Sequence, residues 1–424
     1  MNTAIQEAIA LVEEGQTEKG LKTLDRIEKN LHDEEKAVVA ELYYNWGDIH
    51  KAAAMIADLH ELYPFESNLT CFYAELLIEL DKEEEAIALL EEIPASDEQY
   101  PESLLLLADL YQMQGLFEVS EQKLLNAAEL LPDEPIIQFA LGELYFTQGL
   151  YGKAQSYYKK ASGKEHTIAG ISLDSRIAES LSHLGEFEAA LTFYNQIPKH
   201  LLEPDTLFGY GMTALKAGQT KTAVKHLTEL KEMDPGYTSL YVPLASSFEE
   251  EGMFDEAIAA AKEGIKQDEF NKELYLFAAK LSLKLKNDAD AELLLQEAVA
   301  LDPGYVEAAH VLLSVYLQKE DYQAILDLVR EVESYGETNP KFSWYLATAY
   351  KELEEYDSAA AKYKEASQHF ESDRDFLYEY GQFLLEEGRQ REALPLLKKV
   401  LHIDGVNQEL EETILRIEEE EFLG

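Results

Sequence analysis

The chain has 424 residues and carries 83 Asp and Glu against 36 Lys and Arg, a formal net charge of −47. This charge disfavours binding to nucleic-acid phosphates and insertion at anionic membrane surfaces. A hydrophobic fraction of 46%, with 25 Tyr and 17 Phe, argues against a disordered acidic chain.

The cysteine content and the hydropathy pattern indicate where in the cell the protein is expected. The single cysteine, Cys71, permits no intrachain disulfide. Residues 1–11 lack the basic start and apolar run of a secretory leader, and no run of about 18 apolar residues predicts a membrane span. We therefore expect a folded cytoplasmic protein.

A sequence pattern recurs with a period of about 34 residues along the chain. Residues 107–111, followed by Gly115, match residues 141–145, followed by Gly149. Apolar positions repeat twice at helical spacing in each period, which predicts two amphipathic helices joined by a tight turn. Carried in both directions, the pattern predicts about twelve units. They start near Met1, Asp33, Ser67, Pro101, Pro135, Ile171, Pro204, Thr238, Lys272, Val306, Pro340 and Arg374.

Small residues mark two positions of the unit. Glycine at position 15 can take the left-handed conformation that ends a helix, and it is present at Gly15, Gly47, Gly115, Gly149, Gly185, Gly218, Gly252 and Gly388. Alanine at position 20 allows close helix packing, and it is present at Ala52, Ala86, Ala154, Ala190, Ala223, Ala257, Ala291, Ala359 and Ala393. Four units replace the turn glycine, by Asp81, Lys286, Glu320 and Glu354.

Together with small residues at position 8 and bulky ones at position 24, these features resemble the tetratricopeptide repeat (TPR) over nearly the whole chain. The resemblance implies an all-α fold: one right-handed superhelical solenoid spanning residues 1–424. Residues 408–424 read as a C-terminal capping helix, with Leu410, Ile414, Ile417 and Phe422 on one side. One step between units, from Pro135 to Ile171, is two residues longer than the common step of 34, and it predicts a joint near residues 162–170.

Catalytic and metal-binding motifs are not evident in the sequence. We find no phosphate loop, HExxH, EF-hand spacing or nucleophile elbow. The ten histidines are scattered along the chain without metal-ligand spacing. We therefore predict a protein that is not an enzyme and has no cofactor and no metal site.

In TPR proteins, positions 2, 5, 9, 12 and 13 of the first helix line a concave groove. Here position 9 carries a carboxylate in five consecutive units, at Glu41, Glu75, Asp109, Glu143 and Glu179. Apolar side chains at neighbouring groove positions include Tyr44, Leu105, Phe139 and Phe146. Acidic residues are also common on solvated helix faces, and curvature can bury the aromatic rings, so both interpretations stay open.

Exposed apolar residues rimmed by carboxylates favour a protein or peptide partner with a basic or amphipathic segment. We accordingly predict an interaction scaffold or adaptor that binds such a segment in its groove, with no nucleic acid and no membrane insertion. The alternative is a regulatory receptor that closes around a short signalling peptide. The sequence leaves self-association undecided.

Overall fold

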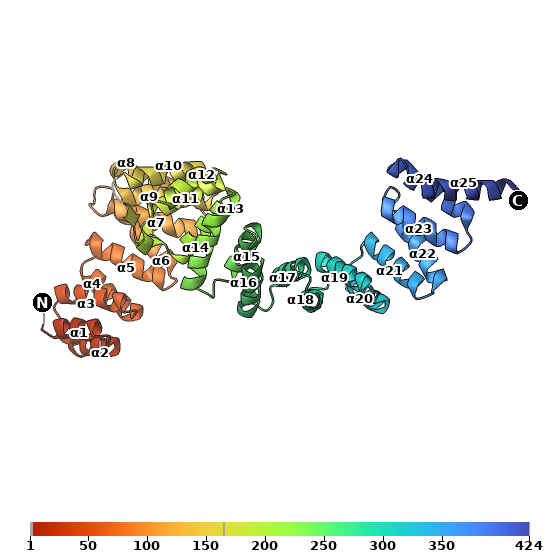
Figure 1. Ribbon diagram of the computed structural model, residues 1–424. Coiled ribbons are helices and arrows are strands. Elements are labelled where there is room, and N and C mark those ends of the chain that lie inside the picture. Colours follow the sequence, from red (N-terminus) through yellow and green to blue (C-terminus); the bar gives the residue numbers. More distant parts are fainter. Residues whose placement is uncertain (1–2, 164–165, 424) are drawn as a thin grey trace. The chain divides into compact units, whose positions relative to one another are not determined.

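The computed structural model describes residues 3–163 and 166–423, and for residues 420–423 it describes the backbone alone. The chain divides into two compact units, Met1–Gly218 and Gln219–Gly424 (Figure 1). Within each unit, consecutive helices pack against one another, so each unit is an α-helical repeat array.

The first unit contains thirteen α-helices and two 3-10 helices among its described residues. They are α1 (Thr3–Glu13), α2 (Thr17–Ile27), η1 (Glu28–Asn30), α3 (Asp33–Asn45), α4 (Ile49–Leu62), α5 (Ser67–Glu79), α6 (Glu83–Glu91), α7 (Tyr100–Met113), α8 (Phe117–Leu130), α9 (Pro135–Thr147), α10 (Tyr151–Ser162), α11 (Leu173–His183), α12 (Phe187–Tyr194), η2 (Lys199–Leu201) and α13 (Pro204–Lys216).

The second unit continues the same alternation. Its elements are α14 (Thr220–Met233), η3 (Thr238–Leu240), α15 (Tyr241–Glu250), α16 (Phe254–Gln267), α17 (Lys272–Lys284), α18 (Asp288–Leu301), α19 (Val306–Gln318), α20 (Tyr322–Ser334), α21 (Pro340–Glu352), α22 (Tyr356–Ala366), α23 (Arg374–Glu386), α24 (Gln390–Asp404) and α25 (Gln408–Leu423). The boundary between the units falls between α13 and α14, inside the seventh predicted repeat.

The turn inside each repeat uses one backbone geometry. Gly149 has φ of 73°, its N–H donates to the Phe146 carbonyl, and the next N–H donates to the Tyr145 carbonyl. This is the Schellman arrangement that ends a helix at a left-handed residue. Where glycine is replaced the geometry persists: Glu354 has φ of 61° and the same pair of hydrogen bonds. The turn therefore forms without glycine.

Small residues meet large ones between the paired helices. Gly142 in α9 lies against the Tyr158 ring of α10, and a Cβ at Gly142 would collide with that ring. In α23, a Cβ at Gly381 would come within 2.7 Å of Leu397. The small residue at position 8 is therefore required by the bulky residue at position 24.

The longer step between the fifth and sixth repeats contains a short β-hairpin. Strands β1 (Thr167–Ile168) and β2 (Ile171–Ser172) are antiparallel, with Thr167 opposite Ser172. The turn residues Ala169 and Gly170 have φ of 49° and 80°, as a two-residue hairpin requires. The Ser172 side chain accepts a hydrogen bond from the Ser175 N–H and caps α11. Helix α11 thus begins at Leu173, two residues after the predicted unit start.

Helix α25 closes the second unit. Leu410, Ile414 and Ile417 are buried and join a cluster that includes Leu397 and Val400 of α24. The side chain of Phe422, predicted for the same face, lies outside the described residues. Assignment of the whole chain to one continuous solenoid and the joint near residues 162–170 stay predictions.

Candidate partner-binding surface

The five position-9 carboxylates, here called the ladder, lie on five first helices: Glu41 on α3, Glu75 on α5, Asp109 on α7, Glu143 on α9 and Glu179 on α11. Helix α5 contacts α7, and α7 contacts α9, although a second helix intervenes in sequence each time. Helix α7, which carries Asp109, therefore adjoins the helices that carry Glu75 and Glu143.

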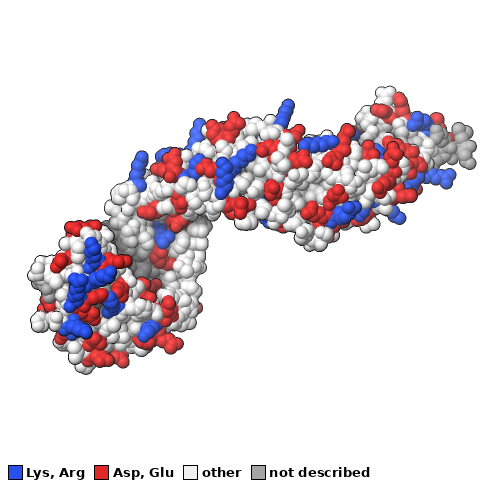
Figure 2. All heavy atoms as spheres, turned by 90° about the horizontal axis from the view of Figure 1, so that it is seen from below, with Lys and Arg blue, Asp and Glu red and all other residues white. Residues whose placement is uncertain are grey.

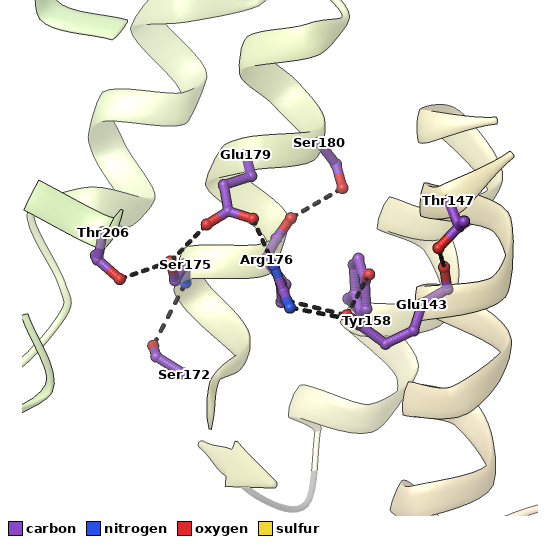
Figure 3. Close-up of polar contacts among 9 residues, drawn as sticks. All are labelled: Glu143, Thr147, Tyr158, Ser172, Ser175, Arg176, Glu179, Ser180 and Thr206. Carbon is purple, nitrogen blue, oxygen red and sulfur yellow. Dashed lines mark hydrogen bonds and ion pairs between the residues drawn. The ribbon is translucent and has the colours of Figure 1, made fainter. Parts of the chain in front are cut away.

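Arg176 of α11 joins the last two carboxylates of the ladder (Figure 3). Its Nη2 donates to Glu143 Oε2 at 3.0 Å, and its Nε lies 3.0 Å from Glu143 Oε1. Nη1 donates to Glu179 Oε2 at 2.9 Å. The guanidinium carbon also lies 5.9 Å from the centroid of the Phe146 ring. One arginine thus occupies the space between two carboxylates and an aromatic ring.

Neighbouring hydroxyls complete this cluster. Tyr158 donates to Glu143 Oε1 at 2.6 Å, and Ser175 donates to Glu179 Oε1 at 3.2 Å. Burial raises the pKa of Tyr158, and the Glu143 carboxylate raises it further. Burial favours a neutral Arg176, but Glu143 and Glu179 outweigh it and raise the pKa of the guanidinium. Glu143 and Glu179 therefore share one counter-cation from within the chain.

The other three ladder carboxylates have no such partner. Glu41, Glu75 and Asp109 form no ion pair and accept no hydrogen bond within the described residues. Burial raises the pKa of Glu75, and the nearby Glu102 raises it further. Burial also raises the pKa of Asp109, although its side chain remains exposed to solvent. Within the described residues, these three carboxylates therefore have no cation to balance them.

The predicted apolar residues differ in how much surface they offer. Phe139 is only 8% exposed and packs against Tyr158, with ring centroids 5.9 Å apart. Its ring is therefore part of the core and offers little surface to a partner. Phe146 is half-buried between Arg176, Tyr151 and His183. The remaining two, Tyr44 and Leu105, are half-buried, and Tyr44 meets Phe72 edge-on at 5.9 Å.

One feature of this surface, the contact of Arg176 with Glu143, was not predicted from the sequence. Arg176 stands three residues before Glu179, a spacing that signals an ion pair within a helix. Its contact with Glu143, 33 residues earlier, depends on how α9 and α11 pack. Met113, another apolar groove position of the repeat pattern, lies at the end of α7, is 58% exposed and adds apolar surface on the same helix as Asp109.

On the face shown in Figure 2, acidic side chains are interspersed with basic and uncharged ones. Among the described residues, no group of three or more His, Cys, Asp or Glu side chains is placed to hold a metal ion. None of the helices in that part of the chain has the length and apolar character needed to cross a membrane.

Family models match three segments of the chain. A model described as "YpiA-like, tetratricopeptide repeats" matches residues 112–165, and one described as "YpiA-like, C-terminal tetratricopeptide repeats" matches residues 340–405. A general tetratricopeptide repeat model matches residues 242–306. All three are repeat families, and no catalytic family is indicated.

Two known proteins resemble the chain over nearly its whole length. The crystal structure of the APC/C hetero-tetramer Cut9-Hcn1 is similar at a TM-score of 0.37 and 16% identity, covering 97% of this chain and 95% of that one. The TPR repeat-containing protein YpiA of Bacillus subtilis (strain 168) is 61% identical over 420 residues, which is 99% of both proteins. Because identity of this extent spans the whole repeat array, the chain belongs to the YpiA-like family of tetratricopeptide repeat proteins.

Proposed function

We propose that the protein is a non-enzymatic cytoplasmic scaffold or adaptor whose first unit binds a basic or basic-amphipathic segment of another protein. Membership in a tetratricopeptide repeat family supports a role in protein–protein interaction. One observation carries the finer proposal: within the part of the chain that the structure describes, Glu41, Glu75 and Asp109 have no cation partner, whereas the next two ladder carboxylates share Arg176.

Arg176 indicates what kind of group the unpaired carboxylates would bind. Glu143 and Glu179 hold its planar guanidinium from two sides, with Phe146 on a third. Planar, multidentate recognition of carboxylates is characteristic of arginine. A partner's arginine or lysine near Glu75 and Asp109 would meet the same carboxylate chemistry, at the same repeat position, without competition from a cation of this chain.

Apolar side chains near the unpaired carboxylates would add affinity. Tyr44 lies one helical turn after Glu41 on α3, while Leu105 and Met113 lie one turn before and after Asp109 on α7. Charged groups at an interface mainly set orientation and association rate, whereas buried apolar contacts supply much of the affinity. The proposed partner segment therefore alternates basic and apolar side chains.

The proposal is tested by partner capture from native lysate with two sets of variants. In the first set, Glu41→Gln, Glu75→Gln and Asp109→Asn are combined; in the second, Glu143→Gln and Glu179→Gln are combined. We expect the first set to lose its main partner and the second to retain it, because Glu143 and Glu179 already share Arg176 as a counter-cation. Binding to the unaltered chain should weaken between low and high salt.

A matched control separates the site from net charge. The combination Glu84→Gln, Glu118→Gln and Glu129→Gln also removes three negative charges, but from the second helices α6 and α8. Partner capture should survive this change. Equal loss of the partner in the control and in the first set, or retention in both, would contradict the proposed site.

A further inference from the structure

A pocket of about 160 Å³ lies in the second unit, on three first helices. Leu317 comes from α19, Glu379 comes from α23, and α21 supplies Lys341, Trp344, Tyr345 and Thr348. Its volume is close to that of cavities known to hold a benzene ring, about 150 Å³. The pocket is therefore large enough for one phenyl-sized side chain.

The wall formed by Trp344 is held in place from two directions. Its indole Nε1 donates to Glu379 Oε2 at 2.9 Å, while Thr348 and Tyr363 donate to Glu379 Oε1 at 2.5 and 2.8 Å. Phe376 and Phe370 meet the indole in edge contacts, at 5.3 and 5.5 Å between ring centroids. Trp344 is nevertheless only half-buried, so part of this fixed ring remains accessible.

Two polar groups at the pocket are not satisfied within the chain. The Lys341 ammonium lies 5.9 Å over the Tyr345 ring, is exposed, and forms no ion pair within the described residues. The Tyr345 hydroxyl has no hydrogen-bond partner in the same part of the chain. Glu379, in contrast, already receives three donors. The group that lacks a counter-charge here is a cation, the opposite of the ladder in the first unit.

We propose that this pocket binds an aromatic side chain of a partner protein that carries a carboxylate next to it in sequence. The aromatic ring packs against Trp344, Tyr345 and Leu317, where offset and edge contacts between rings are favourable. The carboxylate next to the aromatic residue pairs with the Lys341 ammonium. A basic residue at that position would instead be repelled by Lys341, because both carry positive charge. This inference goes beyond the proposed function, because every lining residue belongs to the second unit.

The full-length chain contains two tryptophans, so Trp46→Phe leaves Trp344 as its only indole reporter. The probes are three blocked dipeptides: N-acetyl-phenylalanyl-aspartyl amide, its lysyl counterpart, and N-acetyl-alanyl-aspartyl amide. We expect the first to change Trp344 emission saturably, with a dissociation constant on the order of 1 mM. It should bind about threefold more tightly than the lysyl probe, and the alanyl probe should give no response.

Two substitutions in the same background separate the contributions of shape and charge. Leu317→Phe fills the pocket and should abolish the response, whereas Leu317→Met conserves volume and should retain it. Lys341→Gln should keep aromatic binding but remove the preference for the aspartyl probe. The proposal is overturned if the phenylalanyl-aspartyl probe gives no saturable response or if the lysyl probe binds more tightly. It is also overturned if Leu317→Phe and Leu317→Met bind the probe equally.

Discussion

Four of the repeat turns place a charged residue where the backbone favours glycine. Asp81, Lys286, Glu320 and Glu354 have φ between 57° and 61°, in the left-handed region. An L-residue with a Cβ pays about 1–2 kcal/mol there, whereas glycine does not. The helix packing on either side must therefore supply the energy that holds these turns.

This conformation predicts opposite effects for two turn substitutions. Glu354→Gly should stabilise the turn between α21 and α22 by about 1 kcal/mol, because it removes the left-handed penalty at the cost of some unfolded-chain entropy. Gly149→Ala should destabilise the turn between α9 and α10 by a similar amount. Native-state hydrogen exchange of the flanking helices measures both, and slower exchange in Gly149→Ala would contradict the expectation.

Among the helices, α9 and α11 are joined by a polar cluster rather than by apolar contact alone. Arg176 on α11 reaches Glu143 on α9, and Tyr158 on α10 donates to the same carboxylate. Three helices of two successive repeats thus share one carboxylate. Removing the guanidinium would leave two half-buried carboxylates without a counter-charge, which is more costly than losing an exposed pair.

Arg176→Gln is accordingly predicted to destabilise this part of the first unit by about 1–3 kcal/mol. Adding Glu143→Gln and Glu179→Gln to the same chain should restore much of that loss, because no unpaired charge then remains. Thermal unfolding of the single and triple variants tests the coupling. If the two variants unfold at the same temperature, Arg176 does not act through these carboxylates.

The repeat period was enough to predict the element pattern, because each unit carries its own apolar periodicity and turn residue. It assigned the ladder residues to successive first helices, and they lie on α3, α5, α7, α9 and α11. It did not reveal that Arg176 crosses to Glu143, since that contact depends on helix packing over 33 residues. The burial of Phe139 beneath Tyr158 was also undecided, because its groove position is equally compatible with an exposed ring.

At the scale of the whole molecule, the net charge of −47 would attract many basic segments. Binding at the proposed site must therefore be distinguished from this general attraction by a property of the site itself. Glu75 and Asp109 provide one, because burial raises the pKa of both side chains. Ordinary surface carboxylates protonate near pH 4. These two take up a proton at a higher pH, and each proton removes one negative charge from the proposed site.

Affinity for a basic partner should therefore be full at neutral pH and fall as the pH decreases through the raised pKa values of Glu75 and Asp109. The decline should begin before ordinary carboxylates titrate. A chain with Glu75→Gln and Asp109→Asn should bind more weakly at neutral pH and show a flatter profile above the pH range in which ordinary carboxylates titrate. Titration calorimetry with the captured partner measures both profiles. Identical slopes would contradict a role for these two groups.

The hairpin of residues 167–172 has a consequence for how the array tolerates changes in length. Added residues inside a helix rotate every later side chain about the helix axis, by about 100° per residue. Here the longer connection contains two paired strands, and its last residue, Ser172, caps the N-terminus of α11. The apolar face of α11 is therefore set by this cap and not by the register of α10. We therefore expect insertions and deletions in this connection to leave the apolar faces of the later helices in place, so sequence length can vary at this point.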